Sequence, residues 1–108
     1  MHLDRAKKEF IKQRIADLIK DNDEIEKIIV FGSFNYSDNP NDIDIAVIEN
    51  TQKDYLTLAL KYRKQLREIT SYISIDVIPL KNGLEACSFY PEIQNGEVIY
   101  ERRIQSLA

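Results

Sequence analysis

The chain is poor in several residue types: its 108 residues include no tryptophan, one cysteine, three glycines and three prolines. One cysteine cannot form a disulfide within the chain, which favours a reducing compartment. The low glycine and proline content excludes a collagen-like or low-complexity protein. The sequence has no run of about 18 apolar residues, as a membrane span needs, and charged residues crowd its start, unlike a signal peptide. We therefore predict a cytoplasmic protein without a membrane segment.

Charge and size further limit the class of protein. The net charge is −3, with 44% hydrophobic and 31% charged residues, which is the balance of a folded globular protein. A length of roughly 100–150 residues is typical of one domain, so we expect residues 1–108 to form a single domain. The basic clusters lie among acidic residues on predicted helices, and we expect them to form solvated faces rather than a nucleic-acid interface. These clusters are Lys7-Lys8, Lys12–Arg14 and Lys61–Arg67.

The hydrophobic pattern predicts an α/β (α+β) fold. Apolar residues at steps of three and four predict amphipathic helices over Leu3–Ile19 and Asp54–Tyr72, with Phe10 and Tyr55 on the apolar faces. Runs of β-branched residues predict buried strands. The remaining expected elements are strands over Ile25–Phe31, Ile43–Ile48, Tyr72–Leu80 and Glu97–Glu101, a loop over Ser33–Asn41 and a short helix over Leu84–Gln94. This order implies a mixed sheet of about four strands covered by helices.

Two carboxylates stand at the start of the second predicted strand. Asp42 and Asp44 are two residues apart, so both side chains point to the same face of the sheet, with Cα atoms about 6.6 Å apart. Two carboxylates on one face can share a divalent cation, and oxygen-rich sites suit Mg²⁺ or Mn²⁺. The alternative is a polar strand entrance without a metal.

A third acidic residue, Asp76, interrupts the apolar strand Tyr72–Leu80. An ionised carboxylate buried in such a strand is costly unless it is paired, hydrogen-bonded or bound to a metal. The alternative is an ion pair with a basic residue from elsewhere in the fold. If the strands of Asp44 and Asp76 are neighbours, three carboxylates converge, and a cation is then the favoured explanation.

The first predicted strand ends directly in Gly32-Ser33. Glycine permits a close backbone approach and unusual dihedral angles. The Ser33 hydroxyl and the backbone N–H groups that follow it can hold phosphate oxygens. A glycine followed by a serine after a strand is also a common turn. Here the next strand carries the acidic pair, so Gly32-Ser33 is half of a candidate nucleotide site.

With these residues in place, the sequence resembles the DNA polymerase β-like nucleotidyltransferases, and by its small size the minimal nucleotidyltransferases (MNT) among them. The resemblance is carried by Phe31-Gly32-Ser33, Asp42-Ile43-Asp44-Ile45-Ala46-Val47 and Ile75-Asp76-Val77. It extends over nearly the whole chain, because the leading helix and the closing strand also look like that family.

The resemblance implies a reaction in which a nucleoside monophosphate, AMP from ATP, passes to an acceptor hydroxyl with release of pyrophosphate. Asp42 and Asp44 would hold two Mg²⁺ ions, with Mn²⁺ as a substitute. Asp76 would join them and help to activate the hydroxyl, while Gly32 and Ser33 would bind the triphosphate. One departure is that Ser33–Asn41 contains no lysine or arginine, which predicts weak activity.

Many MNT proteins that stand alone resemble antitoxins paired with a HEPN-domain ribonuclease. This resemblance implies a hetero-oligomer in which the chain adenylylates a hydroxyl of its partner protein. The alternative is a non-catalytic module that neutralises the partner by occlusion, with exposed aromatic residues as anchors. The candidate anchors are Tyr36, Phe89 and Tyr90.

Overall fold

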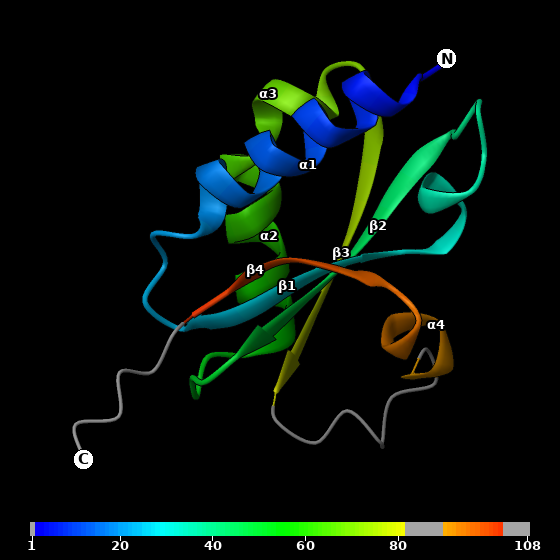
Figure 1. Ribbon diagram of the computed structural model, residues 1–108. Helices are drawn as coiled ribbons and strands as arrows, with labels where there is room; N and C mark the ends of the chain where they lie inside the picture. Colours follow the sequence, from blue (N-terminus) through cyan, green and yellow to red (C-terminus); the bar gives the residue numbers. More distant parts are fainter. Residues whose placement is uncertain (1, 82–89, 103–108) are drawn as a thin grey trace.

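A mixed β-sheet forms the centre of the protein. The computed structural model describes residues 2–81 and 90–102. Within them the sheet has the strand order β3-β2-β1-β4, where β2 and β3 are parallel and the other neighbours antiparallel (Figure 1). The strands are β1 (Ile25–Phe31), β2 (Asp42–Glu49), β3 (Ser74–Lys81) and β4 (Glu97–Glu101). The predicted fold class and the predicted four-stranded mixed sheet are confirmed.

Helices cover both faces of this sheet. One face packs against α1 (Arg5–Ile19), α2 (Tyr55–Gln65) and α3 (Arg67–Thr70), and α4 (Tyr90–Gln94) lies on the other (Figure 1). An aspartate caps the N-terminus of each of the two long helices. The Asp4 carboxylate accepts a hydrogen bond from the Lys7 backbone N–H at 2.9 Å, and the Asp54 carboxylate accepts one from the Thr57 backbone N–H at 2.7 Å. Such caps satisfy backbone donors that the first helical turn leaves free.

The core divides along the two faces of the sheet. The larger part lies under α1, α2 and α3 and includes Ile15, Val30, Ile45 and Tyr62. The smaller part lies under α4 and comprises Ile29, Phe31, Ala46, Ile48 and Ile93. This division follows from the alternation of side chains along β1 and β2.

Two predicted elements differ from the observed ones, and part of a third lies outside the described residues. The helix predicted over Asp54–Tyr72 is two helices, because Leu66 has φ −95° and ψ 14° and so breaks the α-helical path. The predicted loop Ser33–Asn41 overlaps a short 3₁₀ helix, η1, over Gly32–Asn35. Of the helix predicted over Leu84–Gln94, α4 confirms the last five residues, and 84–89 lie outside the described residues.

Some residues assigned to apolar or solvated helix faces are placed differently. Phe10 and Tyr55 are 62% and 55% exposed, because α1 and α2 pack through neighbouring positions such as Ile11 and Leu58. Lys12, expected on a solvated face, is buried, and its Nζ lies 2.7 Å from a carboxylate oxygen of Glu97. A strand far along the chain thus supplies the counter-charge that permits its burial.

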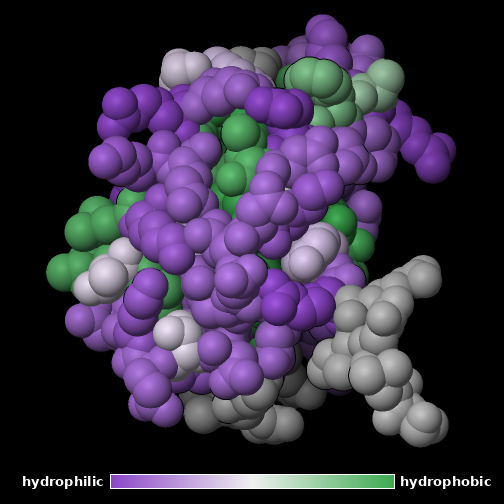
Figure 2. Space-filling view, turned by 90° about the vertical axis from the view of Figure 1, so that its left-hand side faces the viewer, coloured by the Kyte–Doolittle hydropathy of each residue, from purple (hydrophilic) through white to green (hydrophobic). Residues whose placement is uncertain are grey.

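The surface seen in Figure 2 is mainly hydrophilic, and its hydrophobic residues show in small separate groups. This agrees with the charged outer faces predicted for most of α1 and α2. Within the described part of the chain, no helix combines the length and the apolar character that crossing a membrane requires.

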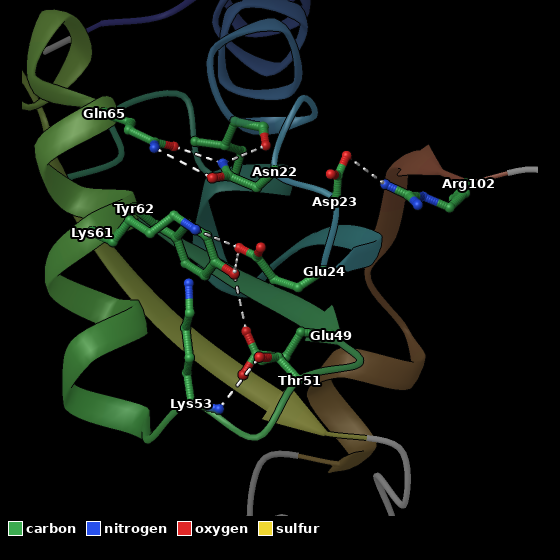
Figure 3. A network of polar contacts seen from close by, with 11 residues as sticks. Asn22, Asp23, Glu24, Glu49, Thr51, Lys53, Lys61, Tyr62, Gln65 and Arg102 are labelled. Atoms are coloured by element: carbon green, nitrogen blue, oxygen red, sulfur yellow. Dashed lines mark hydrogen bonds and ion pairs between the residues drawn. The ribbon is translucent and has the colours of Figure 1, made fainter.

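A polar network fixes α2 to the sheet (Figure 3). The Tyr62 hydroxyl lies 2.9 Å from a Glu24 oxygen and 3.0 Å from a Glu49 oxygen, and Lys61 Nζ lies 2.8 Å from Glu24. A phenol carries one hydrogen and can donate to only one of the two carboxylates. Burial, with the Glu24 charge added, raises the pKa of Glu49 above its ordinary value. A protonated Glu49 would complete the network by donating to Tyr62.

We expect Glu49→Gln to stabilise the protein at neutral and higher pH. The pKa of Glu49 is raised in the folded state. The contribution of Glu49 to folding stability is therefore fully present below its unfolded-state pKa and is lost as pH rises through its folded-state pKa. A neutral amide avoids that loss, which we put at about 1 kcal/mol, or a melting temperature about 5 °C higher. Thermal unfolding at pH 4 and pH 8 should show a larger gap between variant and wild type at pH 8.

Glu68→Gln is the matched control for this prediction. The Arg14 guanidinium, which donates to Glu68 at 2.6 Å and 2.9 Å, lowers the pKa of that carboxyl. Its substitution should therefore have the opposite sign at pH 8 and a small size, since the pair is exposed. A stability gap for Glu49→Gln that does not change between the two pH values would contradict the assignment.

Candidate active site

The turn after β1 brings the backbone against an acidic side chain. Gly32 has φ +79°, a left-handed conformation that favours glycine. A Cβ at this position would lie 2.6 Å from Oδ2 of Asp44, so only glycine permits the observed approach. Phe31 pairs with Asp44 in the β1–β2 ladder, which explains why the turn and the carboxylate meet. Gly32 and Asp44, predicted separately, are therefore in direct contact.

The three predicted carboxylates lie on one face of the sheet and at one end of it. Asp44 on β2 is the register partner of Asp76 on the parallel strand β3, and Asp42 is the partner of Ser74. Neighbouring strands are about 4.8 Å apart, so Asp44 and Asp76 are adjacent. This confirms the expectation that the strands of Asp44 and Asp76 are neighbours.

The expectation that Asp76 is buried in an apolar strand is wrong. Asp76 is exposed, while its neighbours Ile75 and Val77 are buried against the helices. Alternation along β3 therefore turns the carboxylate away from the main core. Asp76 is notable for its position beside Asp44 and not for its burial.

The electrostatics of Asp44 reflect this crowding. Its pKa is raised to about 6, first by burial, then by the negative charges of Asp42 and Asp76, with a side-chain hydrogen bond to Asp76 adding to the effect. Carboxylates that repel one another on a partly buried face are the arrangement that a cation stabilises.

The donor set fits a hard divalent cation. All three side chains offer carboxylate oxygens, the ligands that Mg²⁺ and Mn²⁺ prefer. Within residues 2–81 and 90–102, however, no three acidic, histidine or cysteine side chains are gathered closely enough to hold an ion as they stand. The carboxyl groups of Asp42, Asp44 and Asp76 would therefore have to turn toward a common ion.

Short hydrogen bonds hold the Gly-Ser turn in shape. The Ser33 carbonyl accepts from the backbone N–H groups of Tyr36 and Ser37 at 3.0 Å and 2.8 Å, and the Asn35 amide donates to the Val30 carbonyl at 2.9 Å. Ser33 itself is exposed directly beside Gly32, where a phosphate could reach it. Tyr36, a candidate anchor, is 73% exposed, while Phe89 and the Tyr90 side chain lie outside the described residues.

A cleft of about 470 Å³ opens beside Asp44 and Asp76, and α2 forms its other wall. Leu56, Leu60 and Arg63 of α2 line it. The sequence pattern did not indicate these residues, because the apolar periodicity of the helix marks its buried face. Their spacing of four and three residues, which places them along one exposed side of α2, was the available signal.

Comparison with known proteins decides the family. The model of the family described as "Polymerase beta, Nucleotidyltransferase" matches residues 13–105, which include Gly32, Ser33 and all three carboxylates. The chain belongs to this nucleotidyltransferase family. The predicted family is thereby confirmed. The roles of the five residues in this nucleotidyltransferase stay a prediction. No curated protein sequence matches the chain.

Solved structures of toxin–antitoxin systems share the fold of this nucleotidyltransferase. One is the Shewanella oneidensis structure of a tri-AMPylated HEPN toxin in complex with an MNT antitoxin (24% identity, 88% of this chain and 73% of that chain, TM-score 0.56). Another is a toxin–antitoxin structure with AMP-PNP (24%, 85% and 74%, TM-score 0.57). A third is the toxin–antitoxin MntA–HepT (22%, 87% and 73%, TM-score 0.54).

Proposed function

We propose that this nucleotidyltransferase moves AMP from ATP onto a hydroxyl group of a partner protein. The observation that carries the proposal is the contact of Gly32 with Asp44 and the register of Asp44 with Asp76 at one end of the sheet. A phosphate-binding turn and an acidic cluster on adjacent strands are the parts that nucleotidyl transfer requires.

In the proposed reaction the acceptor oxygen bonds to the α-phosphorus of ATP. The bond from that phosphorus to the oxygen bridging it to the β-phosphorus breaks, so the acceptor gains AMP and pyrophosphate leaves. Asp76, exposed on the face of the sheet, takes the hydroxyl proton and passes it to water. Gly32 and Ser33 hold the triphosphate through backbone N–H groups and the serine hydroxyl.

Asp42, Asp44 and Asp76 would hold two Mg²⁺ ions, and Mn²⁺ could replace them. When bound, such ions withdraw charge from the phosphates and favour ionisation of the attacking hydroxyl. The positive charge matters here because Ser33–Asn41 has no lysine or arginine to offset a triphosphate. The same lack of charge is the reason to expect slow turnover.

The partner we propose is a HEPN-domain protein held in a hetero-oligomer, with this chain as its antitoxin. Support comes from the similarity in fold to MNT antitoxin complexes, one of which contains a tri-AMPylated HEPN toxin. A location in the cytoplasm stays a prediction from the sequence. A second candidate, neutralisation by occlusion without catalysis, is favoured by one observation, the absence of a basic residue from Ser33–Asn41.

The test uses ATP labelled at either the α- or the γ-phosphate, Mg²⁺ and the protein encoded by the adjacent reading frame. Adenylyl transfer predicts that the partner gains the α-label but not the γ-label, and that EDTA prevents the gain. Transfer of the γ-label would instead indicate a kinase and would sink the proposal. A stable complex with no label from either form of ATP would support occlusion.

A further inference from the structure

The cleft beside Asp44 and Asp76 has a wall that the proposed chemistry does not use. We call it the α2 wall and define it by the four exposed residues among the five of α2 that line the cleft: Tyr55, Leu56, Leu60 and Arg63. Its three large apolar side chains are 55%, 64% and 57% exposed in that order. Large apolar side chains gathered at the edge of a cleft mark a binding surface rather than a solvated one.

Arg63 adds an unmatched charge to this wall. Several other cations in the described part of the chain form ion pairs, Arg14 with Glu68, for example, and Lys61 with Glu24, whereas Arg63 is among those that do not. Within residues 2–81 and 90–102, the Arg63 guanidinium has neither an ion pair nor a hydrogen bond, although it lines the same cleft as Asp44 and Asp76. A free guanidinium at the end of an apolar strip suits a ligand with a carboxylate next to apolar groups.

The α2 wall and the Gly-Ser turn flank Asp44 on opposite sides. Gly32 follows β1, whereas α2 packs along β3, and β1 and β3 lie on opposite sides of β2. Two strands that are separated by a third, as β1 and β3 are by β2, lie about 10 Å apart. Gly32 and Ser33 therefore lie on the side of Asp44 away from the α2 wall, and Asp76 lies between Asp44 and the wall.

The wall is held in place before any ligand binds. On the side of α2 that faces the connection between α1 and β1, Tyr62 and Lys61 bond to Glu24, and the amides of Gln65 and Asn22 bond to each other at 2.7 Å and 3.3 Å (Figure 3). Arg63 lies between these anchored residues in sequence, so its backbone is fixed. A preformed surface loses little entropy on binding.

We propose that the α2 wall binds the protein segment that carries the acceptor hydroxyl. The apolar part of the wall suits a tyrosine ring with apolar neighbours, its hydroxyl directed toward Asp76, and Arg63 pairs with an acidic residue of the same segment. The inference rests on the proposed function, because it assigns the acceptor side of that site. It makes Leu56, Leu60 and Arg63 specificity-determining residues.

Binding of two fluorescent peptides, followed by anisotropy without ATP, tests this inference. Both peptides have a central tyrosine between leucines, and one carries two glutamates where the other carries two lysines. Wild type should bind the glutamate peptide about 10-fold more tightly than the lysine peptide. Arg63→Glu should reverse that preference, and Leu60→Gln, which adds no charge, should weaken binding of both peptides.

Matched control variants distinguish specific binding at the α2 wall from a general effect of the protein's net charge on peptide binding. Arg67→Glu changes the net charge equally at an exposed position on α3 outside the cleft, and Val98→Gln alters an exposed apolar residue on β4. Both should leave the preference unchanged. Equal binding of the two peptides by wild type, or the same reversal in Arg67→Glu, would overturn the inference. Since this readout needs no turnover, peptide preference without label transfer would count against the proposed function alone.

Discussion

Asp44→Asn should lower the transfer of AMP by about 1000-fold or more while making the folded protein more stable. Asp44 is the central carboxylate, in contact with Gly32 on one side and in register with Asp76 on the other. An amide of the same size removes a negative charge that the cations of the proposed site need, a loss of several kcal/mol in transition-state stabilisation.

Asp44→Asn should raise the free energy of unfolding although it lowers activity. Burial and two neighbouring carboxylates disfavour an ionised Asp44, as its raised pKa of about 6 indicates. Asparagine relieves that repulsion, which after allowance for solvent screening should stabilise the metal-free protein by about 1 kcal/mol. Thermal unfolding in EDTA and initial rates of label transfer measure the two effects separately.

Asp38→Asn is the matched control, because Asp38 is an exposed acid in the loop before β2 and lies outside the cluster. It should change neither quantity appreciably. If Asp44→Asn lost activity only in proportion to a loss of stability, the carboxylate would be structural and the site assignment would be wrong.

Gly32→Ala should have the second largest effect and should damage both stability and activity. Alanine at φ +79° is strained by about 1 kcal/mol, and its Cβ would meet Oδ2 of Asp44 at 2.6 Å, so the carboxylate must move. Together we expect a loss of about 2–3 kcal/mol, a fall in melting temperature of about 10 °C, and transfer reduced by about 100-fold.

A double-mutant cycle isolates the contact between Gly32 and Asp44. In an Asp44→Ala background the acidic oxygen is gone and the nearest remaining side-chain atom, Cβ, lies at an ordinary 3.7 Å. Gly32→Ala should then cost only its backbone strain, about 1 kcal/mol. Gly96→Ala, which would meet Ile29 Cγ2 at 2.7 Å and the Val30 carbonyl at 2.8 Å, should destabilise both backgrounds nearly equally. Equal losses for Gly32→Ala in the two backgrounds would refute the contact as the cause.

Local sequence rules predicted much of the fold. The β-branched run before Gly32 predicted β1 with its observed bounds, and the spacing of Ile11, Ile15 and Ile19 identified the buried side of α1. The break at Leu66 was not predictable, since no glycine or proline marks it and the change in backbone direction depends on packing. The burial of Lys12 depends on Glu97, 85 residues further along the chain, so no local pattern could indicate it.

The candidate site was predictable in its composition but not in its geometry. Alternation in β2 placed Asp42 and Asp44 on one face, and the same alternation in Ser74–Val77 could have indicated that Asp76 is exposed. The register between Asp44 and Asp76 depends on the helical crossover between two parallel strands, which spacing alone does not determine. The α2 wall belongs to that crossover, and its relation to the cleft appears only in three dimensions.

The most direct test of the account is the mass of the adjacent-frame partner after incubation with this protein, ATP and Mg²⁺. The account predicts one or more added AMP groups, mapped by fragmentation to a hydroxyl side chain and absent with Asp44→Asn or Asp76→Asn. A partner that stays unmodified in a stable complex with wild type would contradict the claim that Asp42, Asp44 and Asp76 perform nucleotidyl transfer.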